Sequence, residues 1–256
     1  MTEHERYLFD LRGYIVIPDA LAPDQIGDLN TLMDEQVEKE CAPDEDLHRF
    51  VHLLHWGQAC RSLIDNPVIV PYLVELLGEQ FRLDHDYGEI IRTDSGHLPR
   101  TFHSGGYPFN PAMYYNFHSG SMYNGLTVVA YNLKDVNPGD GGFGCVPGSH
   151  KSNLSFPEDW RDINKAPSII EKITGSAGTA IIFTEALTHG TLPWLGKDDR
   201  RTIFYKYSPH ILSWAAQYYD ADDYSDLTER QKEILEAPNA RYKERKELYL
   251  NHRNKK

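Results

Sequence analysis

Two histidines in this chain carry side chains that could bind a divalent metal ion. His103 ends a short β-prone run and is followed by Gly105 and Gly106, which free the backbone just after the imidazole. His189 follows another β-prone run, residues 179–183. A histidine beside a glycine-rich turn is also common as an ordinary hydrogen-bonded residue. Neither histidine therefore establishes a metal site by itself.

A glycine-rich segment, residues 140–151, lies between the two histidines in the sequence. Its residues DGGFGCVPGSHK are typical of a glycine turn, a short strand and a tight turn. A phosphate-binding loop is excluded, because no helix begins after the glycines and Pro147 interrupts the segment.

Composition limits the classes of partner. The chain has 256 residues and a formal net charge of −12, which repels polyanions, so neither nucleic acid nor a membrane surface is expected as a partner. The apolar runs are shorter than the roughly 20 residues of a membrane helix, and no signal peptide is visible near Met1. The cysteines are odd in number and show no paired spacing, which favours reduced thiols. We expect a cytoplasmic protein.

The elements that position the histidines change in type near residue 80. Before it, helical spacing predicts helices over about 3–11, 22–39 and 66–78, with a strand at 14–17 and a polar loop at 42–50. After it, turn residues separate eight β-prone runs. These runs are 81–83, 87–91, 100–103, 122–133, 143–146, 169–174, 179–183 and 201–207.

The predicted fold class is mainly β with flanking helices. Eight short strands favour a sandwich or barrel, and the nearly continuous apolar run 126–131 suits the core strand of a double-stranded β-helix, or jelly roll. A charged helical segment, 227–250, is broken at Pro238. We expect one domain over 1–256, with N-terminal helices to about 80, a β core over about 81–210, and C-terminal helices from about 211.

The order of several segments resembles the phytanoyl-CoA dioxygenase-like family of iron(II)- and 2-oxoglutarate-dependent oxygenases. The resemblance covers roughly residues 9–208, and its strength lies in the recurrence of the segments in order rather than in any one of them. The segments are Phe9 to Pro18 with the following Pro23 helix, 126–133, 135–142, the PGSHK motif within 146–151, 175–183, 189–191 and Arg200.

This resemblance implies a set of ligands. His103 and His189 would bind iron(II), leaving positions for 2-oxoglutarate and O₂. Arg200 would bind the far carboxylate of 2-oxoglutarate, a task that suits a planar guanidinium, and Arg201 is the neighbouring alternative. Since side chains alternate along a strand, only one of these arginines can face the interior. Thr191 would hydrogen-bond the same carboxylate.

The chain departs from the family pattern at Gly105. Most of the family has His-x-Asp at the metal, whereas this chain has His-x-Gly, so the third protein ligand is missing from its usual place. In related halogenases, a small residue there leaves space for a chloride or bromide ion on the iron. The sequence leaves open a hydroxylase with a carboxylate from elsewhere or a water-completed site, a halogenase, and a non-catalytic cupin-like binding protein. A cupin-fold isomerase or hydrolase with another metal is a further rival.

Candidate replacement carboxylates follow from position in the sequence. Glu185 lies four residues before His189, close enough to reach the metal. Asp84, Asp86 and Glu89 precede His103 and could line the same opening, although turn and surface positions are their simpler interpretation.

The substrate is expected to be a small metabolite. Aromatic residues after His103, together with Trp194, suggest a lid over the metal. No basic cluster is apparent near the site, and nothing in the sequence indicates the oligomeric state. The aromatic residues are Tyr107, Phe109, Tyr114, Tyr115, Phe117 and Tyr123.

Overall fold

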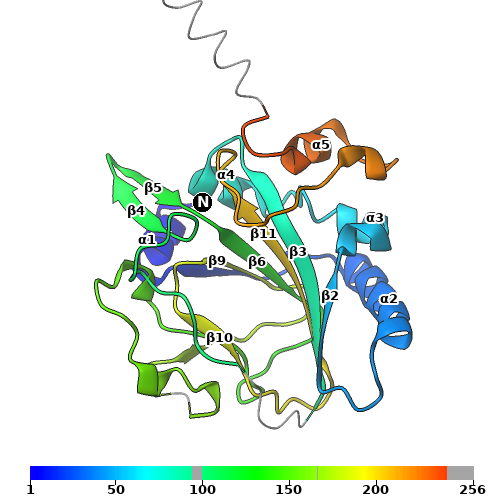
Figure 1. Ribbon diagram of the computed structural model, residues 1–256. Coiled ribbons are helices and arrows are strands. Elements are labelled where there is room, and N and C mark those ends of the chain that lie inside the picture. Colours follow the sequence, from blue (N-terminus) through cyan, green and yellow to red (C-terminus); the bar gives the residue numbers. More distant parts are fainter. Residues whose placement is uncertain (94–99, 166, 241–256) are drawn as a thin grey trace, which may run out of the picture.

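The computed structural model describes residues 1–93, 100–165 and 167–240, which build two facing antiparallel sheets (Figure 1). The larger sheet has six strands in the order β1 (Tyr14–Ile17), β9 (Ala180–Thr184), β6 (Thr127–Asn132), β11 (Arg200–Ser208), β3 (Arg82–Ile91) and β2 (Leu47–Val51). The smaller sheet has three strands in the order β10 (His189–Leu192), β7 (Gly142–Cys145) and β8 (Glu171–Lys172). A separate hairpin joins β4 (Tyr115–His118) to β5 (Ser121–Asn124).

Helices flank the larger sheet. The α-helices are α1 (Glu3–Arg12), α2 (Pro23–Glu40), α3 (Gln58–Arg61), α4 (Val70–Leu77) and α5 (Glu229–Leu235). Short 3₁₀ segments occur at η1 (Leu53–Trp56), η2 (Ser149–Lys151), η3 (Glu158–Trp160), η4 (Ile163–Lys165) and η5 (Ala221–Asp223). Helix α1 begins at a capping box between Thr2 and Glu5 and ends at Gly13, whose left-handed conformation closes the last turn.

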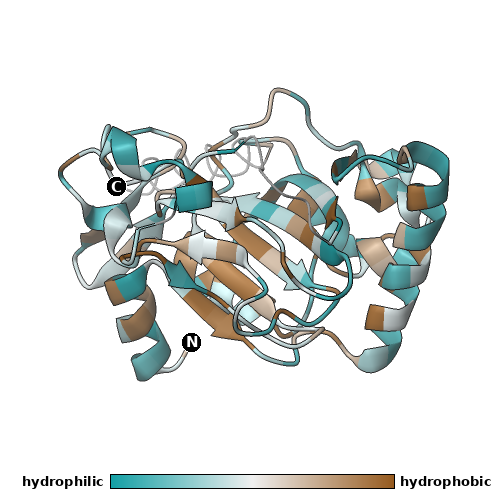
Figure 2. Cartoon of the chain, turned by 90° about the horizontal axis from the view of Figure 1, so that it is seen from below, coloured by the Kyte–Doolittle hydropathy of each residue, from teal (hydrophilic) through white to brown (hydrophobic). Residues whose placement is uncertain are grey.

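The two faces of the larger sheet pack against different layers. Its outer face packs with α2, α3, α4 and α5 into the largest apolar cluster, which includes Leu29, Leu73, Ile203 and Ile234. Its inner face packs against the smaller sheet in a second cluster. Figure 2 shows apolar strands between helices whose outward faces are hydrophilic. Strand alternation produces this division, because successive side chains point to opposite faces.

The predicted fold class is confirmed: the chain is mainly β, with a jelly-roll core and flanking helices. The predicted strand 14–17 and the helix starting near residue 22 are present. The prediction of a loop over 42–50 is wrong for residues 47–50, because β2 pairs with β3 there and extends the sheet. Strands β1 and β2 thus carry the β core into the first 80 residues.

Other strand boundaries also differ from the prediction. Runs 81–83 and 87–91 form one strand, β3, and run 122–133 is divided between β5 and β6. Run 100–103 forms isolated bridges instead of a strand. Strands β4 and β10 were not predicted, since their polar and glycine-containing residues carry little β signal.

The C-terminal prediction is tested only in part. Helix α5 lies within the predicted segment, and residues 241–250 fall outside the described residues. The single-domain assignment stays a prediction.

All cysteines are free thiols, as expected. Within the described ranges, no helix combines the length and apolar character needed to cross a membrane.

Candidate metal and cosubstrate site

The two predicted histidines lie directly opposite each other. His103 and His189 form an antiparallel bridge in which each backbone N–H donates to the other's carbonyl, at 3.0 and 3.1 Å. Their ring centroids are 4.3 Å apart. A bridge between segments separated by 85 intervening residues therefore brings both imidazoles to the same point between the sheets.

Backbone carbonyls fix the same tautomer on both rings. The Nδ1–H of His103 donates to the Thr101 carbonyl at 3.2 Å, and that of His189 donates to the Leu187 carbonyl at 2.7 Å. Since a carbonyl only accepts hydrogen bonds, each Nε2 keeps its lone pair. Burial and the neighbouring His103 lower the pKa of His189 to about 3. His189 is therefore a neutral imidazole at neutral pH.

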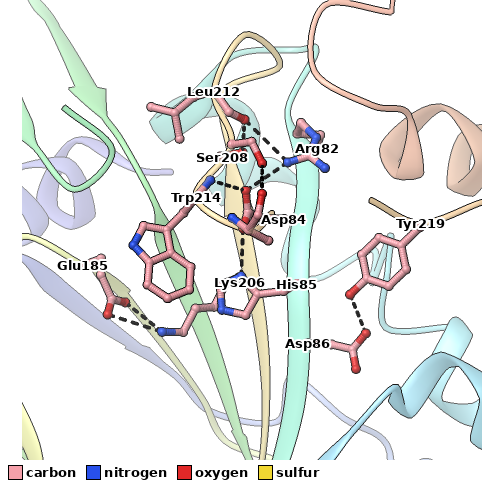
Figure 3. A network of polar contacts seen from close by, with 12 residues as sticks. Arg82, Asp84, His85, Asp86, Glu185, Lys206, Ser208, Leu212, Trp214 and Tyr219 are labelled. Atoms are coloured by element: carbon pink, nitrogen blue, oxygen red, sulfur yellow. Dashed lines mark hydrogen bonds and ion pairs between the residues drawn. The ribbon is translucent and has the colours of Figure 1, made fainter. Parts of the chain in front are cut away.

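Glu185 supplies a carboxylate beside the two rings. It follows β9 directly, is buried, and places Oε1 3.9 Å from His189 Nε2. One ligand atom from each of His103, Glu185 and His189 lies within 4.8 Å of the others. Lys206 Nζ contacts both Glu185 oxygens at 3.2 and 3.3 Å (Figure 3). Burial raises the pKa of Glu185, but Lys206 together with His189 and His103 outweighs this effect, so the net pKa is lowered to about 2 and the carboxylate is ionised.

This donor set fits a divalent first-row metal. Two neutral imidazoles and one carboxylate are the ligands that iron(II) takes in oxygenases with open coordination positions. A second group of candidate ligands, Cys41, Glu45 and His48, lies outside the cavity. Its histidine is already paired, with Glu45 at 2.9 Å and Glu40 at 3.6 Å.

The backbone at Gly105 does not suit the missing aspartate. Gly105 has φ +124°, a conformation that side chains rarely adopt. A Cβ placed there would lie 2.9 Å from Thr188 Oγ1. The Thr188 hydroxyl in turn approaches the Ser104 carbonyl at 3.4 Å. The space beside Gly105 is therefore partly filled by Thr188.

A cavity of about 540 Å³ opens over His103, Glu185 and His189. Both sheets contribute to it: β2, β3, β9 and β11 from the larger and β7 and β10 from the smaller. The lining residues are Arg49, Tyr87, Glu89, Arg100, Thr101, His103, Ser104, Met113, Phe143, Phe183, Glu185, His189, Gly190, Thr191, Phe204, Lys206 and Trp214.

The register of β3 and β11 explains one wall of this cavity. The pairs Lys206↔His85, Phe204↔Tyr87, Thr202↔Glu89 and Arg200↔Ile91 follow each other at every second position. Side chains at alternate positions share a face, so these pairs form a row on the inner face of the sheet.

Arg200 ends this row and is fully buried. Its Nε and Nη1 have no hydrogen-bond partner among the described residues. Burial lowers the pKa of Arg200 to about 10, and the guanidinium still remains charged at neutral pH. A buried cation with unsatisfied donors is costly unless an acceptor completes it, and a carboxylate oxygen is a strong acceptor for such a donor.

Arg201 faces the opposite side of the sheet, as strand alternation predicts. Its guanidinium contacts Asp34 and Asp199, each at 2.7 Å. Of the two neighbouring arginines, only Arg200 thus has donors left for a ligand. Thr191 lines the cavity from β10, where it pairs with Phe143.

The structure separates the other candidate carboxylates. Asp84, Asp86 and Glu89 are all buried, so their interpretation as turn and surface acids is wrong. Only Glu89 lines the cavity, where Arg49 and Arg100 bind its carboxylate at 2.7 to 3.0 Å. Asp84 and Asp86 instead bond to other parts of the chain.

The predicted aromatic lid is not present over the metal ligands. None of the six predicted aromatic residues after His103 lines the cavity, and Met113 is the residue of that segment that does. Trp194 is buried, and its Nε1–H donates to the Asp198 carbonyl.

The expectation of no basic cluster is also wrong, because Arg49, Arg100 and Lys206 converge from separate strands and loops.

Comparisons with known proteins agree with this geometry. The family model described as phytanoyl-CoA dioxygenase (PhyH) matches residues 101–202, which include both histidines, Glu185 and Arg200. This part of the chain is phytanoyl-CoA dioxygenase-like. The predicted family, and with it the class of iron(II)- and 2-oxoglutarate-dependent oxygenases, is therefore confirmed. No curated protein sequence matches the chain.

Solved structures resemble this phytanoyl-CoA dioxygenase-like chain over most of its length. HygX from Streptomyces hygroscopicus, solved with nickel and 2-oxoglutarate, has a TM-score of 0.74 and 20% identity, covering 83% of this chain and 89% of HygX. SnoK, a non-heme α-ketoglutarate-dependent carbocyclase from nogalamycin biosynthesis, has a TM-score of 0.62 and 17% identity, covering 85% of this chain and 88% of SnoK. At these identities the likeness establishes the fold.

Proposed function

We propose that the chain is an iron(II)- and 2-oxoglutarate-dependent oxygenase that hydroxylates a small molecule. His103, His189 and Glu185 would hold the iron. The observation that carries the proposal is the convergence of two imidazoles and a carboxylate at one cavity. Arg200 is not among the residues that line this cavity, but it ends the inner-face row of β11 and keeps two buried nitrogen atoms, Nε and Nη1, without a partner among the described residues.

The bound iron(II) and 2-oxoglutarate would supply O₂ activation coupled to decarboxylation of 2-oxoglutarate to succinate. The chain's own residues would prepare the site for this chemistry. The guanidinium of Arg200 binds the far carboxylate of 2-oxoglutarate by a charge-assisted hydrogen bond, and the Thr191 hydroxyl donates to the same group. Leu187 and Thr101 carbonyls keep both Nε2 atoms aimed at the metal.

Lys206 acts on the carboxylate ligand. By pairing with Glu185, it keeps that side chain ionised and orients it toward the histidines. The aromatic walls formed by Tyr87, Phe143 and Phe204 limit the access of water to the same space.

The structural relatives support a small-molecule substrate. HygX has been solved with nickel, 2-oxoglutarate and hygromycin B, and the epimerase SnoN with Fe³⁺, α-ketoglutarate and nogalamycin RO. Both folds accommodate a metal, a keto acid and a third molecule together. The cavity of about 540 Å³ is of a size suited to such a set.

Hydroxylation is favoured over halogenation by two features of the site. Thr188 occupies part of the space beside Gly105 in which a halide would lie, and Gly105 does not line the cavity. Glu185 offers the carboxylate that a halogenase lacks.

The test is the Glu185→Gln variant, measured for iron content and for succinate formation from 2-oxoglutarate. We expect iron affinity to fall by at least about tenfold, since a neutral amide replaces an ionised ligand, and succinate formation to fall with it. Glu158→Gln removes an exposed carboxylate, 91% exposed, and should change neither quantity.

Lys206 is left unpaired in Glu185→Gln, so the double variant with Lys206→Met separates lost ligation from an uncompensated buried charge. Full retention of iron and turnover in both variants would remove Glu185 as a ligand. Wild-type succinate formation without iron would exclude the oxygenase, and a product that gains chlorine when chloride is added would establish the halogenase.

A further inference from the structure

A row of stacked rings leads from the inner wall of the cavity to its rim. Tyr87 stacks on Phe204 with centroids 4.6 Å apart and planes at 18°. His85 lies next, 6.3 Å from Tyr87, and Trp214 stacks on His85 at 5.2 Å and 28°. Trp214 is 54% exposed and lines the cavity, so it ends the row with a face open to a ligand.

The loop that carries Trp214 is held by a buried carboxylate. Asp84 accepts the backbone N–H of Trp214 at 2.9 Å and that of Ala215 at 3.0 Å (Figure 3). The register of β3 and β11 shifts at this point, so that Asp84 lies in a β-bulge between paired neighbours. Bulges redirect a side chain, and here the bulge directs Asp84 to the loop.

Further charged and polar side chains hold Asp84 and the Trp214 loop in place. Arg82 is fully buried and donates to Asp84 at 3.0 Å and to the Leu212 carbonyl at 3.5 Å. Ser208 Oγ donates to the same carbonyl at 3.0 Å. His85 Nδ1 lies 2.8 Å from the other Asp84 oxygen, so the ring behind the indole is fixed too. An exposed tryptophan held in this way is preorganised before any ligand arrives.

The cavity also has an excess of positive charge, although the chain as a whole is negative. Three cations line it against two carboxylates, Glu89 and Glu185. The charges of iron(II) and the 2-oxoglutarate dianion cancel, so the excess remains when both are bound. Arg49 is half exposed and lies 4.3 Å over the Tyr87 ring, within the row of rings.

We propose that Trp214 and Arg49 select the substrate, and that the substrate is a planar conjugated molecule bearing a carboxylate. The indole face of Trp214 receives the planar body by offset stacking, and the guanidinium of Arg49 pairs with the carboxylate. This inference rests on the proposed function, because it places the substrate in the oxygenase cavity.

The experiment is calorimetric titration of the protein under nitrogen with iron(II) and 2-oxoglutarate bound. Three probes of similar length are compared: cinnamate, which is planar and anionic; cinnamamide, which is planar and neutral; and 3-cyclohexylpropanoate, which is anionic and not planar. We expect cinnamate to bind at least about tenfold more tightly than cinnamamide, as a charged hydrogen bond requires, and several-fold more tightly than 3-cyclohexylpropanoate.

Variants assign the effect to named residues. Trp214→Ala should weaken cinnamate about fivefold or more and leave 2-oxoglutarate affinity unchanged, and Trp214→Phe should restore most of the loss by keeping a ring. Arg49→Gln should reduce the preference for cinnamate over cinnamamide. Trp160→Ala is the matched control, since Trp160 is 38% exposed and does not line the cavity.

Equal affinity for cinnamate and cinnamamide, equal affinity for cinnamate and the cyclohexyl acid, or unchanged binding in Trp214→Ala would each overturn the inference. The binding of iron and 2-oxoglutarate is measured first in the same samples. If these bind and the probes fail, the substrate inference fails alone; if these do not bind, the proposed function fails.

Discussion

The two faces of the strand pair β3 and β11 use polar side chains in opposite ways. On the outer face, Tyr205 donates its hydroxyl to the Cys60 carbonyl at 2.6 Å, and Tyr207 donates to the Leu63 and Ile64 carbonyls at 3.0 and 3.1 Å. On the inner face, Arg200 keeps two buried nitrogen atoms that have no partner within the part of the chain that the structure describes. The hydroxyls of Tyr205 and Tyr207 on the outer face are thus satisfied within the protein, whereas Arg200 on the inner face keeps free donors.

This difference indicates which residues stabilise the fold and which serve binding. An outer-face change should alter the free energy of unfolding and leave ligand affinity as it is. An inner-face change should alter ligand affinity and leave the free energy of unfolding as it is. Where the changed residue is a buried titratable group, it should also alter how the free energy of unfolding depends on pH.

The largest effect is expected at Arg200. In Arg200→Ala, 2-oxoglutarate should bind at least about 100-fold more weakly, because a buried charge-paired hydrogen bond is worth several kcal/mol. Titration calorimetry with iron(II) present measures this affinity. Arg201→Ala is the matched control on the outer face. It removes the contacts to Asp34 and Asp199 and should leave the 2-oxoglutarate affinity unchanged. Equal losses in both variants would contradict the division between the faces.

A smaller effect is expected from acid on the metal-free protein. Since the pKa of His189 is lowered from 6.5 to about 3 on folding, the unfolded state binds more protons between these values. The free energy of unfolding should therefore fall as the pH drops below 6.5, with His189 contributing about 2 kcal/mol between pH 7 and pH 5.

Urea unfolding at several pH values, compared with His189→Gln, isolates this contribution. The variant should lose less stability on acidification than the wild type does. Asp86 on the outer face contributes to the pH dependence with the opposite sign. Burial raises the pKa of Asp86, so the folded state binds its proton more readily and acid increases the free energy of unfolding. Parallel pH curves for wild type and variant would show that His189 is not buried as a neutral ring.

The smallest effect is expected at Tyr207. Tyr207→Phe removes one hydroxyl from the outer face and should lower the free energy of unfolding by about 1 kcal/mol. The 2-oxoglutarate affinity should stay at the wild-type value, because Tyr207 points away from the cavity. A loss of 2-oxoglutarate binding in this variant would show that the two faces are coupled.

Much of the site could be predicted from local sequence. Both histidines and Arg200 stand at recognisable places in an ordered series of short segments, and strand alternation alone separates Arg200 from Arg201. Glu185 could be named because it lies close in sequence to His189. The structure brings His103, His189 and Glu185 together in one cavity, and their roles there remain proposals.

The rest depends on pairings between distant parts of the chain. Arg49 lies on β2, a polar segment whose strand character comes from pairing with β3. Trp214 has no regular element around it, and its place over the cavity depends on Asp84, 130 residues earlier. Lys206 reaches Glu185 only because β11 lies beside β6 in the sheet, with β9 on the other side of β6. Sequence spacing carries no information about such contacts.

The backbone at Gly105 limits how an aspartate could be introduced into this site by design. A side chain at this position would meet both a left-handed backbone and the Thr188 hydroxyl. An engineered His-x-Asp motif would therefore require Thr188 and the 104–106 turn to change together with Gly105. Glu185, which follows strand β9, already places a carboxylate beside the two histidines without that rearrangement.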